Sequence, residues 1–392
     1  MTPRIVTGLG ITSAFGTGAA AFFDGLGKAT RLASRPRGPV ASFDGSLYPE
    51  ARVVEVPEFD ATKYLGDKGL RTLDRLTKLL VVAARLCLHE AGYKRDGQWV
   101  ALAPERVGVC CSNAYGSLEA ITELDRVAKL EDARYINPAK FPNTVSNSAS
   151  GYVSIWEDLR ALNVSVSDGN CGGLDAVACA DVFLETGRAE AILTGGGEAM
   201  SEALFLAFEK LGALGTRGTD AGETRLGEGA AFLAFEMPEV ARARGAKRLA
   251  EVTGYGTAFV APEESTLIYA SREAVVRAID QALADAELGP NDVDLVVSGV
   301  SGLPQFDDEE LAAIDAAGCT GPIVAPKLAL GETLGACGTM GMASTIGWLS
   351  GVPIAKDLLV RGDTPAKVDN VLLTTIGYYG NASALVMRRP SA

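Results

Sequence analysis

Apolar runs typical of buried strands alternate with stretches of helical periodicity along the 392-residue chain. The clearest strands are residues 106–114, 189–200 and 249–256, and residues 70–92 form a long amphipathic stretch that ends on glycine. A regular alternation of this kind favours parallel or mixed sheets that are covered by helices on both faces. We therefore expect a two-halved, layered α/β/α/β/α protein without a flexible linker between its halves.

The composition restricts the partners and the compartment. The formal net charge of −13 argues against nucleic acid and anionic membranes as partners. No apolar run reaches the roughly 18–20 residues that span a bilayer, and the N-terminus lacks the apolar region of a signal peptide, so we expect a cytoplasmic protein. The seven cysteines show neither a CxxC pair nor a zinc-ligand spacing. We expect no metal and no cofactor.

The chain contains a single histidine, His89. Most acid–base chemistry at neutral pH depends on histidine, so little of it is available here. His89 falls near the C-terminal end of the helical stretch 70–92, where an imidazole can complement the helix dipole. We interpret His89 as such a residue rather than as a catalytic one.

The stretch VSVSDGNCGGLDAVACADVF (164–183) predicts a buried strand, a tight turn flanked by glycines, and a helix with Cys171 near its start. Many folds present a nucleophile in this way. Two interpretations follow from these residues alone. Either Cys171 is the nucleophile, or the nucleophile's position holds Asn170, whose amide cannot attack.

Six segments match one protein family in order and spacing. They are VTGLGITSAFGTG, FPNTVSNSASGYVSI, GRAEAILTGGGEA, GEGAAFLAFE, APKLALGETLGACGTMG and GYYGNASALV. The chain thus resembles the β-ketoacyl synthases of the thiolase fold over essentially its whole length. The resemblance implies a duplicated, five-layered α/β/α/β/α architecture with thiolase-like halves over residues 1–237 and 238–392, and an obligate dimer.

Working condensing enzymes of this family use one cysteine and two histidines, supported by a lysine and a glutamate. The cysteine stands at the N-terminal end of a buried helix, where the helix dipole and backbone N–H groups lower its pKa. Matched to the family's motifs, the nucleophile's position falls on Asn170, and the two histidine positions fall on Gly299 and Glu332. The lysine is retained as Lys327, and Cys171 falls one position after the nucleophile.

One subfamily has this profile. The chain-length factors, or ketosynthase β subunits, of type II polyketide synthases replace the cysteine, usually by glutamine, in a stretch such as GEQAGGLDA. This chain has GNCGGLDA, with the shorter amide of Asn170 in the place of the glutamine. A loop that active synthases carry before GEGA is largely missing between Thr216 and Glu228. The resemblance implies a retained fold whose catalytic groups have been replaced.

An inactive subunit of this type can shape a tunnel along the dimer interface and so limit how long a poly-β-keto or polyene chain grows on an active ketosynthase partner. The resemblance implies a heterodimer of the acyltransferase class in which this chain is not catalytic by itself. The strand expected to pair across the interface comprises Val164, Ser165, Val166, Ser167 and Asp168. The candidates for the tunnel wall, each of which could instead be an ordinary core residue, are Tyr115, Leu118 and Phe141.

Acyl carrier proteins are typically acidic, and a chain of net charge −13 is a poor docking surface for them. We therefore expect the carrier protein to dock mainly on the active partner. The basic run RARGAK (242–247) could compensate locally, but we interpret it as a solvated helix end.

Two alternatives stay open. A homodimeric enzyme could transfer acyl groups with Cys171, assisted by Glu332 or Lys327. Against it, a shift of one residue rotates a helical side chain by about 100°, and a nearby Glu332 would raise the pKa of the thiol. Asn170 could not support decarboxylation without histidines to stabilise the enolate. The other alternative is a non-catalytic homodimer that binds acyl chains or a carrier protein, because the sequence does not reveal the dimer partner.

Overall fold

A twelve-stranded mixed sheet dominates the computed structural model, which describes residues 2–35, 40–49, 51–214, 224–262 and 266–391. The strands lie side by side in an order that differs from their order in sequence, and β2 (Gly16–Thr17) pairs with β1 off the main path. Along the sheet the order is β14 (Leu359–Arg361), β13 (Ile323–Val324), β12 (Leu295–Val297), β15 (Asn370–Ile376), β16 (Asn381–Arg388), β11 (Ala250–Phe259), β1 (Arg4–Ser13), β10 (Gly229–Glu236), β8 (Ala191–Glu198), β6 (Val107–Ser112) and β7 (Asn163–Val166).

The sheet consists of two similar halves that meet where β1 and β11 pair over three residues, Arg4 to Val6. In the first half, β6 is parallel to β7 and β8, whereas β10 is antiparallel to β8 and β1. In the second half, β12 is parallel to β13 and β15, whereas β16 is antiparallel to β15 and β11. The same pairing pattern in both halves confirms the expected duplication. The chain passes from one half to the other through α8 (Pro238–Ala243).

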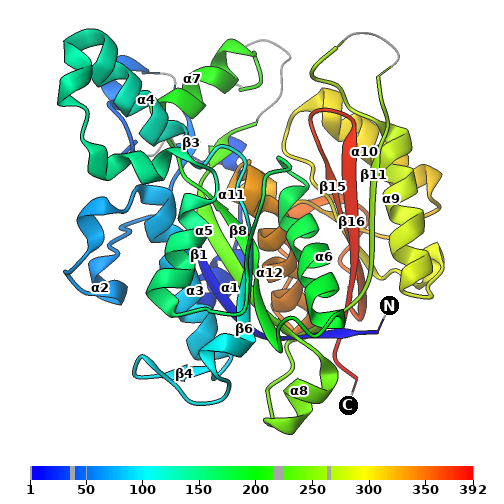
Figure 1. The fold of residues 1–392 in the computed structure, drawn as a ribbon. Helices are drawn as coiled ribbons and strands as arrows, with labels where there is room; N and C mark the ends of the chain where they lie inside the picture. The colour runs from blue at the N-terminus through cyan, green and yellow to red at the C-terminus, as the bar shows by residue number, and fades with distance from the viewer. Residues whose placement is uncertain (1, 36–39, 50, 215–223, 263–265, 392) are drawn as a thin grey trace.

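Helices form three layers around the two half-sheets (Figure 1). The outer helices α3 (Arg75–Glu90) and α5 (Ser148–Glu157) cover the first half, and α9 (Arg272–Asp285) and α10 (Pro304–Ala316) cover the second. Between the half-sheets, α6 (Gly172–Glu185) packs against α12 (Cys337–Leu349). This arrangement confirms the five-layered α/β/α/β/α architecture.

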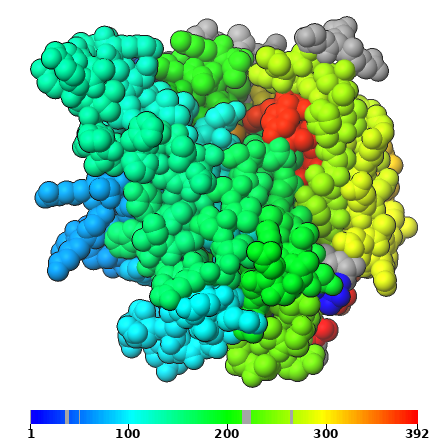
Figure 2. Space-filling model, viewed as in Figure 1, coloured from blue at the N-terminus to red at the C-terminus, as the bar shows by residue number. Residues whose placement is uncertain are grey.

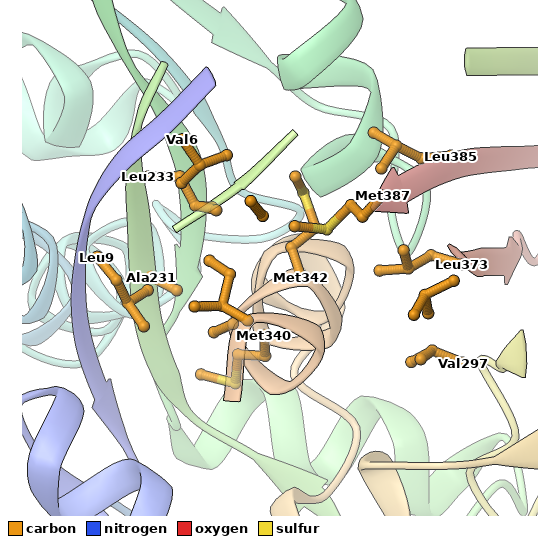
Figure 3. Close-up of a cluster of buried hydrophobic side chains, with 14 of the residues drawn as sticks. Val6, Leu9, Ala231, Leu233, Val297, Met340, Met342, Leu373, Leu385 and Met387 are labelled. Atoms are coloured by element: carbon orange, nitrogen blue, oxygen red, sulfur yellow. The ribbon is translucent and has the colours of Figure 1, made fainter. Parts of the chain in front are cut away.

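The middle layer is built from small residues because it must fit between two sheets. Every residue of α12 is buried. A Cβ atom on Gly338 would lie 2.9 Å from the backbone nitrogen of Leu174, so α6 and α12 cross at backbone distance. Figure 3 shows Met340 and Met342 of α12 between the side chains of the two half-sheets. The neighbours on the two sides are Val6, Leu9, Ala231 and Leu233, and Val297, Leu373, Leu385 and Met387.

Several elements begin or end at other residues than the sequence suggests. Helix α3 begins at Arg75 rather than near residue 70, because the Asp74 carboxylate caps it by accepting a hydrogen bond from the Thr77 N–H at 2.8 Å. The expected interface strand is shorter than predicted, since β7 ends at Val166. Ser167 and Asp168 lie in the turn that follows.

The remaining elements are shorter or lie at the surface. They are α1 (Ala19–Gly27), α2 (Thr62–Leu65), α4 (Leu118–Val127), α7 (Glu202–Lys210), α11 (Lys327–Leu330), β3 (Val53–Val54), β4 (Lys94–Arg95), β5 (Gln98–Trp99) and β9 (Leu226–Gly227). Most of the loop expected to be shortened, residues 216–228, lies outside the described residues. Among the helices that the structure describes, none has the length and apolar character needed to cross a membrane.

Candidate functional site

The turn between β7 and α6 carries Asn170 and Cys171. Gly169 has a φ of +53°, a left-handed conformation that glycine adopts without strain. The Cys171 N–H donates to the Asp168 carbonyl at 3.0 Å and closes the turn. The turn thereby directs the Asn170 side chain toward the second half of the molecule, where its Nδ2 donates to the Ile376 carbonyl at 3.3 Å and reaches Glu332 Oε2 at 3.5 Å.

Glu332 collects donors from four segments of the chain. Its Oε2 accepts from Lys327 Nζ at 2.8 Å and from the Tyr378 hydroxyl at 3.1 Å, in addition to Asn170. Its Oε1 accepts from the Leu334 N–H at 2.9 Å. We call Asn170, Lys327, Glu332 and Tyr378 the Glu332 cluster.

The backbone of Glu332 is fixed by the strand-like segment beside it. Its N–H donates to the Arg225 carbonyl at 2.7 Å, and its carbonyl accepts from the Gly227 N–H at 2.9 Å. Gly331, just before it, has a φ of +82°, and a Cβ atom there would lie 2.9 Å from the Gly227 nitrogen. Only glycine fits this close approach without displacing the backbone.

The buried charges of the Glu332 cluster, on Lys327 and Glu332, are opposite and neutralise each other. Asn170 is 2% exposed, Glu332 1% and Lys327 7%. Burial by itself lowers the pKa of Lys327, but the neighbouring Cys337 sulfur and Glu332 carboxylate outweigh it and hold that pKa well above its usual value. Burial and the Glu332 charge likewise raise the pKa of Tyr378 well above its usual value. The lysine therefore stays charged and the tyrosine stays protonated at neutral pH.

Gly299 lies beyond β12 on the far side of Lys327. Its N–H donates to Glu310 Oε1 at 2.8 Å, and the Thr374 hydroxyl donates to the same oxygen at 2.6 Å. Glu310 Oε2 has no hydrogen-bond partner among the described residues. A cavity of about 20 Å³ lies between Gly299, Lys327 and the N-terminal part of α12, which is room for about one water molecule.

Neither cysteine near the cluster has the surroundings of a nucleophile. The Cys171 side chain is fully buried, with its Sγ 3.8 Å from the Thr375 carbonyl. Burial, and then the Asp175 charge, raise the pKa of the Cys171 thiol well above its usual value. Cys337, whose Sγ lies 3.0 Å from the Asn170 carbonyl, has its pKa raised by burial to about 12. Both thiols therefore stay protonated at neutral pH.

Two carboxylates lie beneath the turn. The hydroxyls of Tyr255 and Ser383 each donate to Asp175 Oδ1 at 2.6 Å, and the Tyr379 hydroxyl donates to Asp168. Burial, followed by the hydrogen bond shared with Asp168, raises the pKa of Asp175 to about 7. The Asp168 side chain thus takes part in this network rather than in the ladder of β7.

The structure therefore brings together Asn170, Lys327, Glu332 and, across the small cavity, Gly299. Sequence reasoning missed three residues that contact this group: Tyr378, Cys337 and Glu310. Tyr378 lies within the quoted stretch GYYGNASALV, and Cys337 within APKLALGETLGACGTMG, but nothing in their spacing distinguishes them. His89 is exposed in the last turn of α3, far along the chain from the Glu332 cluster.

The residues expected at the tunnel wall differ in how far they are exposed. Tyr115 is 48% exposed and Phe141 66%, whereas Leu118 is half-buried against Leu334 and α7. In Figure 2, residues of the central part of the chain, coloured green, cover most of the face that is turned to the viewer. β7 is the last strand of the sheet, with β6 as its neighbour on one side.

The charged groups of the site offer little for metal or acid–base chemistry. Among the described residues, no group of three or more His, Cys, Asp or Glu side chains is arranged to hold a metal ion. No imidazole is available near Asn170, because the sequence has one histidine and it lies at the end of α3.

The basic run 242–247 is partly structural, since Arg244 donates to Glu236 and, at 2.7 Å, to the Ala91 carbonyl.

Comparison with known proteins gives the same family over the whole chain. The family model described as "Beta-ketoacyl synthase, N-terminal domain" matches residues 4–234, and "Beta-ketoacyl synthase, C-terminal domain" matches residues 249–357. The chain is 30% identical to the tetracenomycin polyketide synthase ketoacyl synthase alpha subunit of Streptomyces glaucescens, with 98% of this chain and 97% of that protein covered. It is 28% identical to the corresponding beta subunit, with 99% and 98% covered.

A solved structure described as "The ishigamide ketosynthase/chain length factor" superimposes with a TM-score of 0.86 at 23% identity, over the full length of both chains. This likeness concerns the fold. The identities to the alpha and the beta subunit are nearly equal, so overall similarity does not distinguish the two kinds of subunit. The family models and the full-length relatives establish that the chain belongs to the beta-ketoacyl synthase family.

Proposed function

We propose that this chain is a non-catalytic subunit of the chain-length-factor type, which pairs with an active ketosynthase and shapes the tunnel in which the growing chain lies. One observation carries the proposal. The Glu332 cluster occupies the place where condensation would occur, and its side chains hydrogen-bond to one another. The cavity beside it has a volume of about 20 Å³. A thioester and its phosphopantetheine arm need far more room than one water molecule.

The closure of the site does not depend on a partner. Asn170, Lys327 and Glu332 are already buried in the single chain, and association with a second chain can only bury them further. Lys327 would also stabilise an oxyanion or enolate poorly, because Glu332 already neutralises its charge. These properties support a role in which the chemistry takes place on the partner.

The exposed edge of the sheet supports dimer formation. The Leu162 carbonyl accepts from the Val109 N–H at 3.0 Å, and the Val166 carbonyl accepts from the Asn113 N–H at 3.1 Å, so the N–H and C=O groups of alternate residues of β7 face β6. The N–H and C=O groups of Ser165, which lies between them, face away from β6. Exposed apolar side chains on the neighbouring helices, Ile155 and Val182, would be covered by a partner that pairs with this edge.

The tunnel wall is the second part of the proposal. Tyr115 and Phe141 expose large aromatic side chains, and Leu118 begins α4 between them in sequence. In a dimer they would face the partner's pocket. Bulk there shortens the space for the product, because a close-packed interface does not yield to a longer chain.

We further propose that the carrier protein docks mainly on the partner. This chain does have a basic groove of about 480 Å³ lined by Arg71, Arg75 and Lys78, although Arg75 is engaged by Glu228 at 2.7 Å. Reversal of the other two charges, Arg71→Glu with Lys78→Glu, should change the affinity of the pair for the carrier protein by less than about twofold. A loss of tenfold or more would place the docking surface on this chain.

The decisive experiment compares the chain alone with the chain co-expressed with the active ketosynthase encoded beside it. Native mass spectrometry reports the composition of the dimer, and an acyl-loading assay reports which subunit becomes acylated. We expect a mixed dimer in which only the partner is acylated. A stable homodimer acylated at Cys171 would overturn the proposal. A homodimer that is not acylated and does not bind the ketosynthase would favour an acyl-binding protein.

A further inference from the structure

Glu198, the last residue of β8, is a buried carboxylate held by backbone N–H groups. Its Oε2 accepts from the Ala114 N–H at 2.8 Å and from the Gly335 N–H at 3.4 Å, and its Oε1 accepts from the Tyr115 N–H at 3.1 Å. Burial raises the pKa of Glu198 to about 7, and none of the charged groups that the structure describes contributes to that shift. A carboxylate in such a place is costly to bury unless donors surround it, so these three hydrogen bonds maintain its position.

The three donors belong to two segments that are far apart in sequence. Ala114 and Tyr115 form the turn that leads from β6 into α4, and Gly335 lies three residues after Glu332. The Leu334 N–H, next to Gly335, donates to Glu332 itself. Glu198 therefore connects the turn that carries Tyr115 to the segment that carries Glu332.

The contact between these segments leaves no room for side chains. A Cβ atom on Gly335 would lie 2.6 Å from the Asn113 Cα, and a Cβ atom on Gly196 would lie 2.3 Å from the Gly335 carbonyl oxygen. On the opposite side, Leu334 packs in one apolar cluster with Ala114 and Leu118. Backbone packing thus sets the distance between the segments, and Glu198 supplies the directional bonds that orient the turn.

We propose that Glu198 is a positioning residue for the wall formed by Tyr115 and Leu118, and that it thereby helps to set the length of the product chain. This inference rests on the proposed function. The Tyr115 side chain is largely exposed, so its direction depends mainly on its backbone, and the Tyr115 N–H is one of the donors to Glu198. Without that bond the turn can take several conformations, and the wall no longer stops the chain at one length.

Glu198→Gln tests this directly because glutamine has one acceptor oxygen. That oxygen can accept from the N–H groups of Ala114 and Gly335, or from the N–H group of Tyr115, but not from both sets. The amide NH₂ then faces the remaining N–H donors and cannot accept from them. The matched control is Glu236→Gln, at the last residue of the neighbouring strand β10. Glu236 is equally buried and accepts from the Thr7 and Tyr93 hydroxyls at 2.6 and 3.0 Å and from Arg244, but it does not contact the turn.

The first measurement is amide hydrogen exchange of the chain without a partner. At pH 8, where Glu198 is mostly ionised, we expect the peptide that contains Ala114 and Tyr115 to exchange about tenfold faster in Glu198→Gln, as for the loss of one hydrogen bond to a charged acceptor. The same peptide should be unchanged in Glu236→Gln. Equal exchange in Glu198→Gln and the wild type would overturn the inference whatever the chain's function is.

The second measurement is the distribution of product lengths made by each variant together with the active ketosynthase, a carrier protein and malonyl units. Tyr115→Ala serves as a reference, because it removes the wall itself. We expect Glu198→Gln to broaden the distribution in the same direction as Tyr115→Ala, and Glu236→Gln to leave it unchanged. If Tyr115→Ala alters the lengths and Glu198→Gln does not, the inference is wrong and the proposed function stands. If neither alters them, the tunnel proposal itself fails.

Discussion

Lys327 and Glu332 form an ion pair in which both side chains are almost wholly buried, so each charge depends on the other. Lys327→Met leaves the Glu332 carboxylate without a cation and should lower the free energy of unfolding by about 3–5 kcal/mol. The double variant Lys327→Met with Glu332→Leu removes both charges and should recover most of that loss. Urea denaturation of the two variants measures the difference. Equal destabilisation by the single and the double variant would show that packing, not charge, dominates.

The small cavity beside Lys327 gives a second prediction at the scale of single residues, because two glycines on its walls differ in their surroundings. A Cβ atom on Gly299 would lie 2.9 Å from Glu310 Oε2, on a carboxyl group that Thr374 also holds in place. Gly299→Ala should therefore destabilise the chain by about 1–3 kcal/mol. A Cβ atom on Gly341 would lie 3.4 Å from Leu373 Cδ2, an ordinary contact, so Gly341→Ala in α12 should stabilise it by about 0.4–1 kcal/mol.

Thermal unfolding of the two glycine variants tests this expectation. We expect Gly299→Ala to lower the melting temperature and Gly341→Ala to raise it. A stabilising Gly299→Ala would mean that the Glu310 carboxyl moves freely and that a side chain at position 299 is tolerated.

At the same scale, the resemblance to the family's motifs was sufficient to single out Asn170, Gly299, Lys327 and Glu332, which the structure brings together. It could not find Glu310, because that contact joins the backbone of position 299 to a side chain on a separate helix, α10. Contacts of this kind depend on how the elements pack, and no pattern within one segment encodes them.

Among the secondary-structure elements, the edge strand β7 gives a third prediction. Ser165→Pro removes the N–H group that faces away from β6, and should leave the ladder between β6 and β7 in place. It should therefore abolish pairing with a partner while the chain stays folded. Ser165→Ala is the matched control, since both variants lose the 2.6 Å hydrogen bond to the Ser150 hydroxyl. Native mass spectrometry measures dimer formation, and circular dichroism measures folding.

If Ser165→Pro still forms the dimer, the interface does not use this edge. If Ser165→Ala also fails to form it, the hydroxyl rather than the peptide group is required. Either result would contradict the proposed continuation of the sheet across the interface.

The elements differ in how far the sequence predicted them. The fully buried β8 follows from an apolar run that ends in three glycines, and α12 from a run of small residues. The start of α3 was misplaced, because the capping side chain of Asp74 lies inside an otherwise continuous helical pattern. The pairing of β1 with β11, which joins the two half-sheets, has no local signal at all.

For the molecule as a whole, the three carboxyl groups whose pKa values are raised furthest make stability depend on pH. Burial is the main reason that the pKa values of Asp175, Glu198 and Glu310 are each raised to about 7. In the unfolded chain the same groups titrate near 3.8 for Asp and 4.5 for Glu. At pH values between the unfolded and the folded pKa, the folded chain holds protons on these carboxyl groups and releases them when it unfolds. Their contribution to stability is therefore complete below about pH 4 and is lost as the pH rises through about 7.

Glu251 acts in the opposite direction. Burial tends to raise its pKa, but the hydrogen bonds from Arg388 and Ser391 lower it below the usual value. Its contribution is present above about pH 4.5 and is lost in more acidic solution. The maximum of stability should therefore lie in mildly acidic solution, near pH 5, rather than at neutral pH.

We predict that the free energy of unfolding falls between pH 5 and pH 8, with each raised group contributing a slope of at most about 1.4 kcal/mol per pH unit. Urea denaturation in about 1 M salt measures this slope while screening the repulsion that a net charge of −13 adds. Glu310→Gln cannot titrate, so it should flatten the slope by up to one such contribution, whereas Glu239→Gln at an exposed position should leave it unchanged. A slope that is equal in the wild type and in Glu310→Gln would contradict the prediction, because it would mean that the pKa of Glu310 is not raised in the folded chain.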